Sequence, residues 1–280
     1  MKYADLHAHT AESDGTYTPV QLVREAVARG LSAVAIVDHD SVGAVACALE
    51  EAKETNCEVI PGIELTAQQD NQEIHILGYF LDYQQAALLD ELKLVRQNRV
   101  ERVYKIIENL KESGIELNAQ TVFNISGCGT VGRMHIARAL VKDGWVSSTS
   151  EAFRKYIGDR SPAYVLGFRF SPAEAIKLIR DAGGVAVLAH PYILENDGLI
   201  AEFARCGLQG LEVYYPEHSQ SLVNFYLDLA KKLDLLVTGG SDFHGSAKPN
   251  IKLGAIKVPL ELVEKLRQAT EPTLNNGYIG

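Results

Sequence analysis

The chain has 280 residues, of which 46% are hydrophobic and 22% are charged, proportions that are ordinary for a globular protein with a buried core. A chain of this length can form one large domain or a domain with an insertion. Its net charge of −9 argues against binding of long nucleic acid such as duplex DNA, which requires a basic stripe. Small anionic substrates are still compatible with this charge, because bound metal ions would reverse the local charge at a site.

Membrane and redox features narrow the class further. No stretch reaches the length of about 18 apolar residues that predicts a membrane span, and the N-terminus has no apolar signal core. The four cysteines lie far apart and form no CxxC pair, so we expect reduced thiols. These features favour a cytoplasmic protein without a membrane partner.

Strands and helices alternate through the first eighty residues. A capping box that begins at Thr18, with proline next to it, predicts a helix that Gly30 ends, and a second helix is expected from Ser41 to about Thr55. Short runs rich in Val, Ile, Leu or Ala predict strands over residues 3–6, 33–37, 57–60 and 74–80.

The pattern changes after residue 83. A long, charged amphipathic helix is predicted from about Tyr83 to Ser113, and further helical pieces follow to about Phe170 with few buried-strand runs. We therefore predict that residues 84–168 form a helical insertion, which would act as a lid over the substrate.

Alternation resumes after this segment. A capping box at Ser171 opens a helix that ends at Gly183. Strands are predicted over residues 185–189, 211–214 and 235–238, and helices over 198–205, 220–232 and 259–269. About seven strands, mostly separated by helices, predict an α/β fold in which residues 1–83 and 169–280 form a (β/α)7 barrel, with the active site at the C-terminal ends of the strands.

Histidines and carboxylates gather at the ends of these strands or in the loops that follow. His7 and His9 are spaced i, i+2, so on a strand both rings would lie on one face and reach one ion. A charged triplet follows the strand 33–37 directly, where it is costly unless it faces a ligand, a metal or water. The candidate ligands comprise six imidazoles and three carboxylates: His7, His9, Asp14, His39, Glu64, His75, His190, Asp242 and His244.

Single members of this set have simpler explanations. Asp14 beside a glycine fits turn chemistry, Glu64 fits a surface turn, and His75 between two isoleucines fits a buried core histidine. Taken together, nine groups exceed the three or four that one catalytic zinc needs, so we expect two or three divalent ions with Glu64 as the bridging ligand. Imidazole and carboxylate suit manganese, which we favour, with iron or zinc as alternatives.

Such a cluster predicts a reaction class. Ions about 3.5–4 Å apart can clamp a phosphoryl group and lower the pKa of a water between them. We therefore predict hydrolysis of phosphate esters by a hydroxide that bridges two ions, without a serine or cysteine nucleophile.

The whole pattern resembles the PHP family, the polymerase and histidinol phosphatase phosphoesterases, along essentially the entire chain. The resemblance implies a distorted seven-stranded β/α barrel that holds a trinuclear centre. It assigns His7, His9, Glu64 and Asp242 to the first ion, Glu64, His75 and His190 to the second, and Asp14, His39 and His244 to the third. Asp14 stands where some relatives have histidine.

Two further segments resemble the TrpH/YciV-type subgroup of this family, residues 212–218 and residues 132–138, although Met134 replaces the usual proline. That subgroup includes a 5′-to-3′ exonuclease on short RNA and phosphatases of 3′,5′-bisphosphonucleotides. The resemblance therefore implies a small phosphorylated nucleotide or a short oligonucleotide as the substrate.

Candidate substrate-binding and catalytic residues lie outside the metal set. Arg133 is the best candidate for a bidentate phosphate clamp, with a surface helix arginine as the alternative. His135 and His218 can contact phosphate or protonate a leaving group, or can be structural. Arg160, beside a turn, is a weaker candidate for anion binding.

Three other functions fit parts of the pattern. A histidinol-phosphate phosphatase is disfavoured by the insertion and by the segment around Arg133. A non-catalytic metal-binding PHP module is disfavoured by the complete ligand set. A metal-dependent amidohydrolase or deaminase is disfavoured because no lysine follows a central strand in the expected place.

Overall fold

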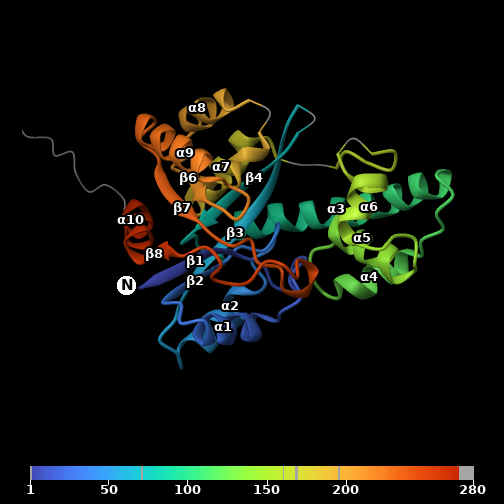
Figure 1. Ribbon diagram of the computed structural model, residues 1–280, viewed down its shortest axis with the longest axis horizontal. Helices are drawn as coiled ribbons and strands as arrows, with labels where there is room; N and C mark the ends of the chain where they lie inside the picture. The colour runs from blue at the N-terminus through green and yellow to red at the C-terminus, as the bar shows by residue number, and fades with distance from the viewer. Residues whose placement is uncertain (1, 71, 160, 168–169, 195, 271–280) are drawn as a thin grey trace, which may run out of the picture.

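The computed structural model describes residues 2–70, 72–159, 161–167, 170–194 and 196–270. Its strands are β1 (Tyr3–Ala8), β2 (Ala33–Ile36), β3 (Glu58–Gln69), β4 (Gln72–Tyr79), β5 (Val185–Leu188), β6 (Gly210–Tyr214), β7 (Leu236–Gly239) and β8 (Val258–Pro259). They form one sheet in the order β7-β6-β5-β4-β3-β2-β1-β8, which curves into a nearly closed barrel (Figure 1). The predicted α/β barrel is confirmed, with eight strands because the two-residue β8 pairs antiparallel to β1.

The middle of the sheet departs from simple β/α alternation. β3 pairs antiparallel with β4, from Gly62 opposite Tyr79 to Gln69 opposite Gln72, and β4 pairs antiparallel with β5. β3 is much longer than the predicted strand 57–60, so Glu64 lies within a strand and not in the loop after it. The prediction was wrong because Pro61 and Gly62 interrupt the apolar run, although apolar and polar residues alternate over 63–67 and all five are buried.

Helices cover the outer face of the barrel (Figure 1). They are α1 (Pro19–Ala28), α2 (Val45–Ala52), α7 (Pro172–Asp181), α8 (Gly198–Arg205), α9 (Gln220–Lys232) and α10 (Leu260–Thr270). The predicted capping boxes at Thr18 and Ser171 are present. α2 begins four residues later than predicted, because Asp40 has a positive φ of 48° and the chain turns before it enters the helix. None of the described helices is long and apolar enough to cross a membrane.

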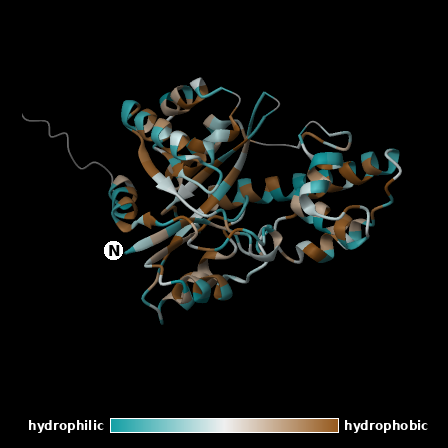
Figure 2. Cartoon of the chain, in the orientation of Figure 1, coloured by the Kyte–Doolittle hydropathy of each residue, from teal (hydrophilic) through white to brown (hydrophobic). Residues whose placement is uncertain are grey.

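Hydrophobic side chains from alternate strand positions fill the barrel. Leu77 and Tyr79 of β4 share one buried cluster with Val185 and Val187 of β5, and α10 packs against the same cluster. The sheet is mostly brown in Figure 2, whereas the outer helices carry both brown and teal. His75 lies two residues before Leu77, and Glu64 is directly opposite Leu77, so both continue the inner face of the sheet.

The segment between β4 and α7 is helical and has a hydrophobic core of its own. It contains α3 (Ala86–Glu112), α4 (Ala119–Ser126), α5 (Arg133–Lys142), α6 (Thr149–Ala152) and the π-helix η1 (Phe153–Ile157). The first half of α3 packs on the barrel through Leu88 and Leu92, and its second half packs through Val103 and Ile106 in the separate cluster. α3 therefore joins the two cores, and the other helices stand to one side of the barrel (Figure 1).

The barrel closes along a seam between β1 and the chain that follows β7. The Phe243 amide donates to the His7 carbonyl at 3.2 Å, and the His9 amide donates to the Phe243 carbonyl at 2.9 Å. Gly240 is required at this seam, because a Cβ atom there would clash with the backbone and Cβ of His7. The seam is thus held by few backbone hydrogen bonds and by close packing.

Candidate metal centre

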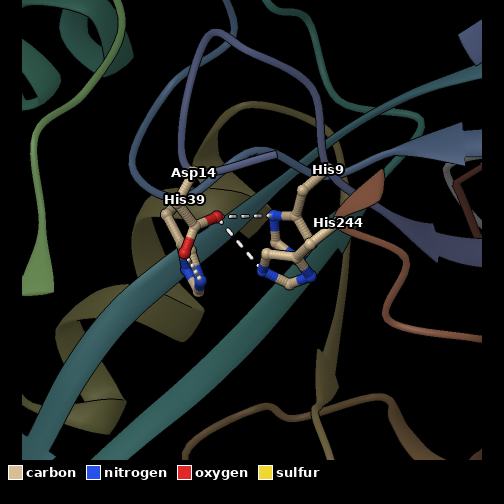
Figure 3. A group of neighbouring side chains, drawn as sticks. All are labelled: His9, Asp14, His39 and His244. Carbon is tan, nitrogen blue, oxygen red and sulfur yellow. Dashed lines mark ion pairs between the residues drawn. The ribbon is translucent and has the colours of Figure 1, made fainter. Parts of the chain in front are cut away.

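The structure brings all nine predicted ligands together at one end of the barrel. They come from β1, β3 and β4 and from the loops that follow β1, β2, β5 and β7. Three groups have ligand atoms within 4.8 Å of one another: His9, Asp14, His39 and His244; His7, His9 and Asp242; and His39, Glu64 and His75. Figure 3 shows the first group, with the Asp14 carboxylate turned toward the rings of His9 and His244.

Glu64 occupies the middle of the cluster. Its Oε2 atom lies 3.4 Å from His7 Nε2, 3.2 Å from His9 Nε2 and 3.2 Å from His39 Nδ1. Its Oε1 atom lies 3.0 Å from His75 Nδ1 and 3.3 Å from His190 Nε2. One buried carboxylate therefore faces five rings, with its two oxygens directed at different groups of ligands.

Asp242 uses its two oxygens differently. Oδ1 lies 3.3 Å from His9 Nε2 and 3.5 Å from His7 Nε2. Oδ2 accepts hydrogen bonds from the Tyr215 hydroxyl at 2.7 Å and from Lys248 Nζ at 2.6 Å. Tyr215 and Lys248 thus fix the orientation of the carboxylate through Oδ2, and Oδ1 is directed at the imidazoles of His7 and His9.

The buried polar atoms of the cluster fit divalent cations. Both ring nitrogens of His9, Nδ1 of His39, Nδ1 of His190 and Oδ1 of Asp14 have no hydrogen-bond partner among the described residues. Buried polar atoms are nearly always satisfied, so several unsatisfied ones in one place indicate a bound group. Imidazole nitrogens and carboxylate oxygens are the ligands that manganese, iron and zinc take.

Charges within the cluster shift its ionisation. Burial alone would raise the pKa of Glu64, but the surrounding rings, His39 foremost, hold that pKa well below its ordinary value. Burial alone would lower the pKa of His75 and His9, but the neighbouring carboxylates raise it to about 10 for His75 and to about 9 for His9. The metal-free centre therefore binds protons where the loaded centre would bind ions.

Because protons bind at His9 and His75 in the metal-free protein, its stability should depend on pH. A ring whose pKa rises on folding stabilises the fold fully below its unfolded value, near 6.5, and that contribution disappears as pH rises through the folded value. We therefore expect the Tm of the chelated protein to fall between pH 7 and pH 10, the range in which His9 and His75 lose their protons.

The metal-loaded protein should behave in the opposite way. Ligating imidazoles must be neutral, so protons on His75 and His9 compete with the ions, and metal affinity weakens as pH falls through about 10 and then about 9. Thermal unfolding with EDTA and with Mn²⁺ across this range tests both statements. A chelated protein whose Tm stays constant or rises from pH 7 to pH 10 would contradict the argument.

Three carboxylates outside the predicted ligand set hold the candidate ligands in place. Glu212 is fully buried and lies with Oε1 2.9 Å from His7 Nδ1, while its Oε2 accepts from the His190 amide at 2.8 Å. Glu73 Oε1 lies 2.9 Å from His75 Nε2. Asp38 accepts hydrogen bonds from Thr10 and Ser13, and so fixes the loop that carries Asp14. A charged residue within an apolar strand is a signal that could have identified Glu212.

A cavity of about 270 Å³ opens between the ligand cluster and the helical segment. Its wall includes Asp14, His39, His75, His244 and Lys248 from the barrel, and Arg99, Arg102, Arg133, Met134 and Phe153 from the helical segment. Four cationic side chains thus surround a small space beside the metal ligands. This arrangement suits a small anion better than a neutral ligand.

The predicted substrate residues differ in how they relate to this cavity. Arg133 lines it, but it also donates to Glu73 at 2.8 Å and to Asp159 at 2.5 Å. His135 is buried and accepts from the Gly132 amide at 3.0 Å, within the first turn of α5. Neither His135 nor His218 is part of the cavity wall. Arg160 lies outside the described residues.

His218 belongs to an aromatic cluster behind the metal ligands. Its Nδ1 donates to the Val213 carbonyl at 2.7 Å, and its Nε2 is buried without a partner among the described residues. Its ring centroid lies 5.4 Å from those of Tyr192 and Tyr215. Because Tyr215 bonds to Asp242, this cluster is continuous with the metal centre.

Comparisons with known proteins identify the family of this chain. The PHP domain family model matches residues 5–159. The 5′-3′ exoribonuclease Rnm of Escherichia coli is 35% identical over 257 residues, which cover 89% of this chain and 87% of that protein. The 3′,5′-nucleoside bisphosphate phosphatase of Chromobacterium violaceum is 32% identical over 270 residues, 91% of each chain.

A crystal structure from Bifidobacterium adolescentis, described as a candidate metal-dependent phosphoesterase, has a TM-score of 0.89 and 32% identity over 98% of each chain. The fold, the clustered ligands and these relatives define a metal-dependent phosphoesterase, a hydrolase that acts on phosphate esters. The chain belongs to the PHP family, as its sequence pattern predicted.

Proposed function

We propose that this protein hydrolyses phosphate esters of small phosphorylated nucleotides, as a phosphatase of 3′,5′-bisphosphonucleotides or as a 5′-to-3′ exonuclease on short oligoribonucleotides. The observation that carries the proposal is the cavity of about 270 Å³, which joins metal ligands on one wall to Arg99, Arg102 and Arg133 on the other. The names of the two relatives described above support it. The net charge of −9 favours such small substrates over duplex DNA.

We propose two or three divalent ions at the centre, with manganese preferred and iron or zinc as alternatives. When bound, these ions would stabilise charge on the phosphoryl oxygens and activate a water molecule. Glu64 would contribute one oxygen to each of two groups of ligands, and Asp242 would direct Oδ1 to the rings of His7 and His9 while Tyr215 and Lys248 hold Oδ2.

Residues 84–168 would form the lid in this proposal, because α3, α5 and η1 supply one wall of the cavity. Arg133 would orient the substrate phosphate, which would compete with Asp159 for its guanidinium. A substrate contact by His218 would require the ring to move, because its Nε2 is buried outside the cavity wall and its Nδ1 already donates to the Val213 carbonyl. A substrate contact by His135 would first require its bond to the Gly132 amide to break.

The direct test is turnover by manganese-loaded protein of adenosine 3′,5′-bisphosphate and of 5′-phosphorylated RNA of two to five nucleotides, with metal content measured on the same sample. Release of phosphate or of mononucleotides is the expected result, and the product separates phosphatase from exonuclease. Histidinol phosphate is the comparison substrate. Turnover of that compound alone, or no turnover by a fully loaded protein, would contradict the proposal.

An exposed aromatic ring beside the centre leads to a prediction about oligonucleotides. Tyr192, in the 3-10 helix η2 (Pro191–Ile193) that follows His190, is 39% exposed, and its ring packs 5.7 Å from that of Tyr215. Stacking of a base on such a ring is worth about 1–3 kcal/mol. We expect Tyr192→Ala to raise KM for a 5′-phosphorylated dinucleotide about fivefold or more, with little change for the bisphosphonucleotide.

The matched control for this experiment is Tyr104→Ala, which removes an exposed tyrosine on α3, 54% exposed and packed against Phe123. It should leave both KM values unchanged. Equal effects of Tyr192→Ala on both substrates would assign the residue to local packing and reject the stacking role.

A further inference from the structure

Glu73 links a metal ligand of the barrel to the helical segment above it. It lies on β4 two residues before His75, so both side chains project from the same face of the strand. Its Oε1 atom lies 2.9 Å from His75 Nε2, and its Oε2 accepts from an Arg133 terminal nitrogen at 2.8 Å. The side chains of Glu73, His75 and Arg133 are only 16%, 15% and 13% exposed, so this row of contacts is largely shielded from water.

The contact with Glu73 determines how His75 faces the centre. An ionised carboxylate can only accept a hydrogen bond, so Nε2 carries a proton and donates it to Glu73. The other ring nitrogen, Nδ1, lies 3.0 Å from Glu64 Oε1 and 3.3 Å from His190 Nε2. His75 would therefore offer Nδ1 to an ion, and a carboxylate on the far nitrogen fixes both the tautomer and the ring orientation of such a ligand.

The contact with Arg133 connects Glu73 to the cavity lid. Arg133 is the first residue of α5, and its other terminal nitrogen donates to Asp159 at 2.5 Å and to the Ile157 carbonyl at 3.2 Å. Its guanidinium carbon also lies 5.7 Å from the centroid of the Phe153 ring. One end of the guanidinium is thus tied to the helical segment, and the other end is tied through Glu73 to β4.

We propose that Glu73 is a positioning residue that couples metal binding at His75 to the closure of α5 over the cavity. The inference rests on the proposed metal centre. His75 would hold an ion through Nδ1, and such an ion would polarise the Nε2–H bond and strengthen its hydrogen bond to Glu73. That carboxylate in turn holds Arg133, and because coupling between two sites is reciprocal, a closed α5 raises metal affinity by the same factor.

Four variants test this coupling. Glu73→Ala removes both contacts, and Glu73→Gln keeps the side-chain shape but removes the charge that His75 and Arg133 share. Asp159→Asn weakens the other ion pair of Arg133 without touching His75. Glu58→Gln is the matched control, because Glu58 also pairs with an arginine, Arg267, at 2.7 and 2.9 Å, but away from the centre.

Two measurements are made on each protein: the affinity for Mn²⁺ by titration, and the hydrogen exchange of residues 133–142 with and without Mn²⁺. In the wild type we expect Mn²⁺ to slow exchange in α5. Both Glu73 variants should bind one ion about 10- to 100-fold more weakly. At saturating Mn²⁺, they should also lack the slower exchange in α5. Asp159→Asn should keep the wild-type affinity, and Glu58→Gln should match the wild type in both measurements.

The outcomes separate this inference from the proposed centre. A wild type that binds no Mn²⁺, Fe²⁺ or Zn²⁺ would reject the centre and the inference with it. A wild type that binds ions, with Glu73 variants that bind equally well, would reject the inference alone. Weaker binding with undiminished protection of α5 would also overturn the coupling. Far-ultraviolet circular dichroism establishes that each variant is folded.

Discussion

Glu64→Gln is expected to abolish turnover and to leave the purified protein with substoichiometric metal. Glu64 is 1% exposed and faces the rings of five histidines at 3.0–3.4 Å. An amide is neutral and presents one acceptor in place of two, so it cannot serve two ions at once. Because such ions contribute several kcal/mol to transition-state stabilisation, kcat should fall by about 10³-fold or more.

The fold should survive this substitution. Glutamine has nearly the volume of glutamate, and the backbone amide and carbonyl of residue 64 keep their bonds to Asp38 and Asp40. Metal content, kcat and circular dichroism measured on one preparation test the prediction, with Glu58→Gln as the control. A folded Glu64→Gln protein with wild-type kcat would remove Glu64 from the centre.

Asp242→Ala should likewise abolish turnover while the barrel stays folded. The substitution removes the oxygen that faces His7 and His9, and it deprives Tyr215 and Lys248 of their common acceptor. The loss in kcat should again be about 10³-fold or more, since an ion loses a charged ligand. Steady-state kinetics and metal analysis on the same sample measure it.

A second variant at this position separates the loss of the carboxylate charge from a loss of folding. Asp242 has a φ of 54°, a conformation that alanine adopts at a cost and asparagine tolerates better. Asp242→Asn should therefore be inactive with a Tm closer to the wild type than that of Asp242→Ala. Retained activity in Asp242→Asn would show that the charge of this side chain is dispensable.

Local patterns were sufficient to predict much of the fold. The runs 33–37 and 185–189 are apolar throughout, as strands buried on both faces are, and they correspond to β2 and β5. The capping boxes at Thr18 and Ser171 predicted the start of α1 and α7 to the residue. Histidines and carboxylates in or near the predicted strands indicated nine candidate ligands, and the fold brings these nine side chains together at one end of the barrel.

Features that depend on distant contacts were not predictable in this way. β8 is two residues long and exists because it pairs with β1. Arg99 on α3 donates to Asp40 at 2.8 Å and to Thr66 at 2.9 Å, yet nothing in its helical neighbourhood indicates that role. Lys248 likewise donates a hydrogen bond to Asp242, and only the folded loop brings the two side chains together.

The seam between β1 and the chain after β7 bears on how long the folded protein persists. His7 and His9 lie on one side of that seam, and Asp242 and His244 lie on the other, so any ion that they share cross-links the two ends of the barrel. An ion that binds the folded chain and not the unfolded one stabilises the folded chain by mass action. Ion release would then precede global unfolding, and the lifetime of the native state would be governed by the metal off-rate as much as by the packing of the core.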